Sequence, residues 1–241
     1  MEFGVNVDPG HWPDDPAQAM RLLKRTGATW TRTVLMGDNA SIVQTYFEAC
    51  IANNIAELGV VGRESYYFSE HPKEIEFKNR LGLLTDLYKD QVDIWQIGNQ
   101  PDNPAPDSWT QDEDTTDMML RVANDVIPAE QGLICAPALV TGQPYTIDTL
   151  KVSYTAKNIY TTARKYKGET FPAFDNTGFL VTEYPSNIPS LGDKIVKLGQ
   201  AEIVFVFCLS DKMYPGLGLF DVNDKPTSSF RAFKKMVEAN S

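Results

Sequence analysis

Short apolar runs alternate with amphipathic stretches along the whole chain of 241 residues. The runs are rich in β-branched and aromatic residues, as expected of buried strands. They lie at residues 3–7, 29–36, 58–61, 92–97, 133–140, about 150–155, 179–182 and 203–208. The first amphipathic stretch follows Asp15 and Pro16 and stops at Gly27, which predicts a helix with an Asp N-cap, a Pro in its first turn and a Gly C-cap.

Further helices are predicted where apolar residues recur three and four positions apart. They run through residues 42–50, 77–88, 119–126, 159–166, 191–198 and 230–237. Eight strands, each followed by a connection, predict one domain over residues 1–241, a single compact α/β fold of the (β/α)8 TIM barrel class. A doubly wound open sheet is the alternative, but it favours a glycine-rich first turn, and the first strand leads into Asp8-Pro9-Gly10-His11-Trp12 instead.

Composition narrows the function classes. There are 22 Lys and Arg against 32 Asp and Glu, a formal net charge of −10, which argues against nucleic acid or an anionic membrane surface as the main partner. Two histidines, His11 and His71, are too few for a three-histidine zinc site, and we expect neither metal nor cofactor. The three cysteines, Cys50, Cys135 and Cys208, each lie in an apolar run and are expected to be buried free thiols.

No run reaches the ~18 apolar residues of a membrane span, so no membrane association is expected. The first residues read as a strand and not as a signal peptide. The compartment stays open, because secreted and cytoplasmic locations are both compatible with this pattern. A closed barrel of this size can stand alone, so we expect a monomer.

Two strand ends carry the chemistry, because function in barrels lies where strands end at their carboxyl face. The fourth run continues as Gly98-Asn99-Gln100-Pro101-Asp102, and the seventh reads Val181-Thr182-Glu183-Tyr184. The chain here resembles clan A of the glycoside hydrolases, retaining enzymes that carry Asn-Glu-Pro after the fourth strand and a second Glu after the seventh. The segment 216–226 near the end of the chain is also similar to these enzymes. The resemblance does not assign a family within the clan; families 5, 39 and 128 are the first to compare, and the compact size favours the last.

The resemblance implies a role for each matching residue. Glu183 takes the place of the nucleophile, and Gln100 stands where these enzymes carry the Glu that is the general acid/base. Retaining hydrolysis places two such carboxyl groups ~5–5.5 Å apart across the cleft. Asn99 is expected to hydrogen-bond the sugar 2-hydroxyl, Arg32 to hold Glu183 anionic, and Tyr154 to donate its hydroxyl to the nucleophile or the sugar.

Gln100 departs from the pattern, because an amide cannot protonate a leaving group. Three interpretations stay open: a deliberate Glu→Gln substitution that traps intact substrate, a natural barrel that only binds sugar, or an enzyme whose acid lies elsewhere. Asp102 is the nearest candidate for that third case. The flanking Asn99 and Pro101 keep the active pattern, which favours the first interpretation.

Several loop residues are candidates for sugar contacts. Trp12, Trp109 and Tyr184 are expected in loops after strands, where aromatic planes can stack on sugar rings, although loop aromatics also cap barrel cores. Asp8, after the first strand, is a further candidate. Clan A members usually carry an aromatic residue near the end of the eighth strand, where this chain offers Leu209 or its neighbours.

The sequence therefore predicts a retaining glycoside hydrolase that cleaves a β-linked, neutral oligosaccharide or polysaccharide by double displacement. A noncatalytic glycan-binding barrel is the alternative. A phosphate-handling barrel is a third class, because Gly216-Leu217-Gly218 after the eighth strand can mimic a phosphate loop. In the loop after the eighth strand, Asp211 is expected to hydrogen-bond its own loop or a sugar hydroxyl.

Overall fold

The computed structural model describes residues 1–8, 15–38, 40–65, 71–99, 113–135, 159–161, 179–186 and 201–240. Eight parallel strands form one sheet in the order β5-β4-β3-β2-β1-β8-β7-β6. Their bounds are β1 (Glu2–Asn6), β2 (Trp30–Val34), β3 (Ala56–Val61), β4 (Ile94–Ile97), β5 (Leu133–Cys135), β6 (Ile159–Thr161), β7 (Phe179–Pro185) and β8 (Ala201–Phe207). The first strand pairs with both the second and the eighth, which is the strand order of a (β/α)8 barrel.

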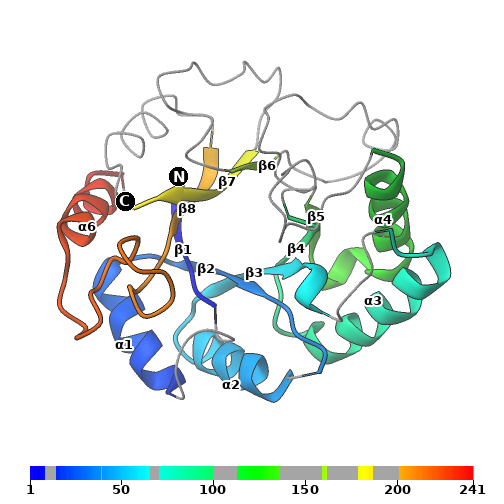
Figure 1. Cartoon of the computed structure of the whole chain (residues 1–241), viewed down its shortest axis with the longest axis horizontal. Helices are drawn as coiled ribbons and strands as arrows, with labels where there is room; N and C mark the ends of the chain where they lie inside the picture. The colour runs from blue at the N-terminus through cyan, green and yellow to red at the C-terminus, as the bar shows by residue number, and fades with distance from the viewer. Residues whose placement is uncertain are drawn as a thin grey trace.

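The helices of the described ranges lie outside the strands, on the left, lower and right sides of the sheet in the view of Figure 1. They are α1 (Pro16–Thr26), α2 (Ala40–Ile51), α3 (Glu74–Tyr88), α4 (Glu113–Val126) and α6 (Ser228–Asn240), with short 3-10 helices at Arg63–Ser65 and Ala129–Gln131. The predicted ends of the first helix are confirmed. The Asp15 side chain accepts a hydrogen bond from the Ala17 backbone N–H at 2.9 Å, and Gly27 takes a left-handed φ of 80°.

The sixth strand is the main correction to the predicted elements. Ile159–Thr161, where a helix was predicted to begin, form a strand of three residues that pairs with β7, so the predicted helix start at Ile159 is wrong. A strand of three residues is too short to show an alternating pattern. The spacing of Ile159, Ala163 and Tyr166 meanwhile mimics one face of a helix. Residues 150–155, and with them Tyr154, lie outside the described residues.

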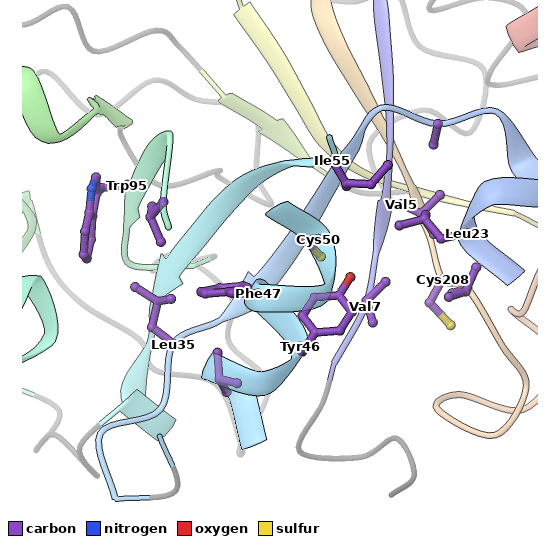
Figure 2. Close-up of a cluster of buried hydrophobic side chains, with 14 of the residues drawn as sticks. Val5, Val7, Leu23, Leu35, Tyr46, Phe47, Cys50, Ile55, Trp95 and Cys208 are labelled. Atoms are coloured by element: carbon purple, nitrogen blue, oxygen red, sulfur yellow. The ribbon is translucent and has the colours of Figure 1, made fainter. Parts of the chain in front are cut away.

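Two apolar layers follow from the alternation of side chains along each strand. The outer layer packs strands against helices, and Figure 2 shows Tyr46, Phe47 and Cys50 of α2 facing the sheet. The inner layer consists of strand residues alone and fills the barrel. Its buried members are Leu58, Val60, Ile94, Cys135, Leu180, Ile203 and Phe205.

Gly4 makes room for the largest of these inner side chains. It lies beside Phe205 across β1 and β8, and a Cβ atom added to Gly4 would lie 2.3 Å from the ring. Gly4→Ala is therefore expected to lower the free energy of unfolding by ~1–3 kcal/mol, measured by urea denaturation, because it overpacks the barrel.

The matched control is Gly82→Ala on α3, where an added Cβ meets nothing within 4 Å and helix propensity predicts a small gain in stability. Adding Phe205→Leu to Gly4→Ala should recover part of the loss. Additive losses for this pair would contradict the packing explanation.

Candidate active site

Polar side chains cluster inside the barrel toward the carboxyl ends of β1, β2 and β4. Asn6 is the last residue of β1 and pairs in register with Arg32 of β2. Gln96 lies on β4, and Asn99 follows that strand by two residues. Asn6, Arg32 and Gln96 are 4%, 5% and 0% exposed, and Asn99 is half-buried. The apolar filling of the barrel thus gives way to a polar layer at the end where barrel enzymes place their active sites.

Arg32 is at the centre of this layer and donates to three different side chains. Its Nη1 lies 2.6 Å from Asn6 Oδ1, its Nε lies 2.9 Å from Gln96 Oε1, and its Nη2 lies 3.0 Å from Asn99 Oδ1. Asn6 in turn donates from Nδ2 to the Val206 carbonyl at 3.3 Å, which connects the cluster to β8. The guanidinium therefore links residues of three strands and the loop that leads to Gln100.

The electrostatics of this layer favour an anion. These three acceptors of Arg32 are neutral amides, and the guanidinium keeps its charge at any ordinary pH. A buried cation is stabilised by a nearby negative charge. A carboxylate within about 4–6 Å of the guanidinium would be favoured in its ionised form.

The structure brings together only part of the predicted site. Arg32 and Asn99 are in direct contact, and Asp8, the second residue after β1, is half-buried. The backbone of Glu183 belongs to β7, where it is in register with Thr161 of β6. The remaining predicted positions, Gln100, Trp12, Trp109 and Tyr154, lie outside the described residues.

Tyr184 requires a correction. It was expected in a loop, but β7 runs to Pro185, and the Tyr184 side chain is 3% exposed in the core cluster shared with the helices. The sequence predicted a shorter seventh strand because Glu183 and Pro185 interrupt the apolar pattern at its end. Tyr184 is therefore a core residue and not a sugar contact.

The eighth strand ends on an aromatic residue two positions before Leu209, within the segment where an aromatic residue was expected. Phe207, the last residue of β8, is half-buried, and its ring centroid lies 4.7 Å from that of Tyr214, which is 37% exposed. Leu209, the expected candidate, is 0% exposed in the core. In the sequence, Phe207 is the end of an apolar run and is indistinguishable from a core residue. Its position as the last residue of β8 is what distinguishes it from the core residues of that strand.

The loop after β8 uses its glycine amides internally. The Asp211 carboxylate accepts from the backbone N–H groups of Gly216 at 3.0 Å and Gly218 at 2.8 Å. Those two amides are the donors that a phosphate loop would offer, so the geometry disfavours the phosphate-handling class. The expectation that Asp211 hydrogen-bonds its own loop is confirmed.

Cys50, Cys135 and Cys208 are buried free thiols, as predicted. Within the described ranges, no group of three or more His, Cys, Asp or Glu residues is arranged to hold a metal ion. None of the helices in the described part of the chain is long and apolar enough to span a bilayer.

The fold is similar to that of solved glycoside hydrolases. GH5_18 from Bifidobacterium longum subsp. longum, a Glu→Ala variant in complex with Manβ1-4GlcNAc, matches with a TM-score of 0.75 and 12% identity over 100% of this chain and 78% of that chain. A hyperthermophilic endocellulase from Pyrococcus horikoshii gives 0.70 and 10% identity over 97% and 92%. Gas2p of Saccharomyces cerevisiae, a Glu→Gln mutant in complex with laminaritetraose and laminaripentaose, gives 0.67 and 12% over 99% and 63%.

No family model and no curated protein sequence matches the chain. At 10–12% identity the likeness to these structures concerns the fold. The strand order and this likeness together establish the (β/α)8 barrel. Any inference about its reaction must come from the residues at the carboxyl ends of the strands.

Proposed function

We propose that the chain is a retaining glycoside hydrolase acting on a β-linked, neutral oligosaccharide or polysaccharide, with an amide in place of its general acid/base. Glu183 is the nucleophile in this proposal, and Gln100 occupies the acid/base position. The observation that carries it is the direct hydrogen bond from buried Arg32 to Asn99, the residue that precedes Gln100. That contact joins a permanent cation to the fourth-strand motif at the carboxyl face of the barrel.

Each part of the site has a physical task in this reaction. Glu183 must be ionised to attack the anomeric carbon, and the charge of Arg32 favours that form. Asn99 donates from its amide nitrogen to the sugar 2-hydroxyl, a contact that strengthens in the transition state. Phe207 offers an apolar ring at the strand end against which a sugar face can pack.

The neighbours support a carbohydrate ligand. Solved structures of similar fold hold Manβ1-4GlcNAc, cellotetraose or laminari-oligosaccharides. In each of these complexes a Glu has been replaced by Ala or Gln. An amide at position 100 fits the same kind of protein, one that retains an uncut oligosaccharide.

The decisive experiment uses the chain as it is, with 2,4-dinitrophenyl β-cellobioside as substrate. Its leaving group departs without protonation, so a burst of dinitrophenol is expected, followed by slow turnover because no base activates the water that must cleave the glycosyl-enzyme. Azide is a nucleophile that needs no base. Adding azide should accelerate turnover and give β-cellobiosyl azide.

Glu183→Gln should abolish the burst and the azide product together. An α-configured product would contradict the retaining mechanism. The alternative is a noncatalytic glycan-binding barrel, which the amide at position 100 also permits. It would be favoured if the chain binds cellotetraose or laminaritetraose but gives no burst with the dinitrophenyl glycoside of either oligosaccharide.

A further inference from the structure

We infer that Gln96 is a positioning residue that fixes the direction of the Asn99 side chain and so makes Asn99 a hydrogen-bond donor toward the barrel mouth. The inference rests on the proposed function for its kinetic consequence. Its geometric part stands on the described residues alone.

Gln96 is wholly buried and is held at both ends by partners of opposite kind. Its Oε1 accepts from Arg32 Nε at 2.9 Å, and Arg32 is a group that only donates. Its Nε2 donates to the Gly98 carbonyl at 2.8 Å and to Asn99 Oδ1 at 3.3 Å, which are both acceptors. The carboxamide of Gln96 therefore has one satisfactory orientation.

That orientation is passed on to Asn99. Its Oδ1 accepts from Arg32 Nη2 as well as from Gln96 Nε2, so the oxygen is kept on the side of the guanidinium. The Nδ2 end is consequently directed away from Arg32. Two donors converge on one oxygen, and a reversed Asn99 would place its NH2 group against both of them.

Gln96→Glu tests whether Gln96 orients Asn99, with almost no change in side-chain shape. The new carboxylate still accepts from Arg32, whose charge keeps it ionised. It has no N–H group, however, so an acceptor now faces both the Gly98 carbonyl and Asn99 Oδ1. The new carboxylate repels Asn99 Oδ1 and attracts Nδ2. We therefore expect the Asn99 amide to reverse, so that Nδ2 donates to the carboxylate and Oδ1 faces the mouth, at the cost of the hydrogen bond from Arg32 Nη2 to Oδ1.

The first measurement needs no activity. In protein labelled with ¹⁵N-asparagine, the side-chain NH2 signal of Asn99 is assigned by its loss in Asn99→Asp. In Gln96→Glu one of its protons should move downfield and exchange more slowly with water, because it becomes hydrogen-bonded to a buried carboxylate. An unchanged signal in a folded Gln96→Glu protein would overturn the inference.

The second measurement separates positioning from general damage. In the Gln100→Glu background, kcat/KM is compared for 2,4-dinitrophenyl β-cellobioside and its analogue that lacks the 2-hydroxyl on the sugar next to the leaving group. Gln96→Glu should lower the preference for the 2-hydroxyl substrate by ~10-fold, the effect of one misplaced hydrogen bond. Gln96→Met, which removes the donor without adding charge, should lower it by less, because Arg32 still holds Asn99 Oδ1.

Thr33→Val is the matched control. Thr33 is buried beside Arg32 on β2, and its hydroxyl has no hydrogen-bond partner within the described ranges, so the variant should leave both the NMR signal and the substrate preference unchanged. An equal loss on both substrates in Gln96→Glu would assign Gln96 a merely structural role. If the Gln100→Glu protein itself turns over neither substrate, the proposed function fails, and the NMR measurement still decides the direction of Asn99.

Discussion

Gln100→Glu is expected to raise the rate of hydrolysis of an unactivated β-linked glycan by ~10²–10⁴, the usual contribution of a positioned general acid. The sugar oxygen of such a substrate is a poor leaving group and must be protonated as the bond breaks. The N–H protons of an amide are not acidic enough to be transferred to the leaving oxygen, whereas the proton of a carboxylic acid at the same place is. The measurement is release of reducing ends from cellotetraose or laminaritetraose by the two proteins, at matched concentration.

The gain should depend on the leaving group and on the nucleophile. For the dinitrophenyl glycoside the glycosylation step should change much less, because that leaving group needs little protonation. The double variant Gln100→Glu with Glu183→Gln should return to the background rate. Equal hydrolysis by the parent chain and the Gln100→Glu variant, with binding of the oligosaccharide intact, would contradict the assignment of position 100.

Stability is expected to fall as the pH rises from about 5 to about 8, because of a buried carboxyl group on the side of the sheet that faces the helices. Glu57 of β3 is 0% exposed and faces Cys50 of α2 and Thr31 of β2, whose hydroxyl hydrogen-bonds it. Its second oxygen, Oε2, has no hydrogen-bond partner in the described part of the chain. Burial raises the pKa of Glu57 from 4.5 to about 8, and the Asp93 carboxylate adds to the rise.

The folded and unfolded chains bind different numbers of protons in this pH range. Between the two pKa values the folded chain holds a proton on Glu57 that the unfolded chain has lost, so the unfolded state binds fewer protons. The stabilisation is fully present below about pH 4.5 and disappears as the pH rises through about 8. The slope approaches about 1.4 kcal/mol per pH unit in that window. Urea denaturation at a series of pH values, followed by tryptophan fluorescence, measures it.

Glu57→Gln should remove this slope, since an amide mimics the protonated carboxyl group at every pH. The variant is expected to be close to the parent near pH 5 and more stable than the parent near pH 8. Glu48→Gln, which changes an exposed carboxylate on α2, is the matched control and should keep the parental slope. A Glu57→Gln protein with the parental slope would show that other groups carry the pH dependence.

The sequence predicted those site residues that a local pattern marks, and it did not predict the contacts between them. Arg32 and Asn99 were predicted separately, from a strand and from a strand end, and the structure joins them by a hydrogen bond of 3.0 Å. Gln96 and Asn6 were not predicted, because a polar residue inside a β-strand does not reveal which face it occupies. Phe207 was included only as a neighbour of Leu209, since an aromatic residue in an apolar run is indistinguishable from a core residue in the sequence.

The sequence by itself determined the strand–helix alternation, the ends of α1, the buried state of the three cysteines and the barrel class, because each depends on residue type, capping and periodicity within a short window. Tertiary structure decided the rest. The three-residue β6 is a strand because it pairs with β7. Tyr184 belongs to the core because β7 extends beyond the apolar run that predicted it. The polar layer of Asn6, Arg32, Gln96 and Asn99 forms because parallel strands bring their carboxyl ends together, and no local pattern records which strands become neighbours.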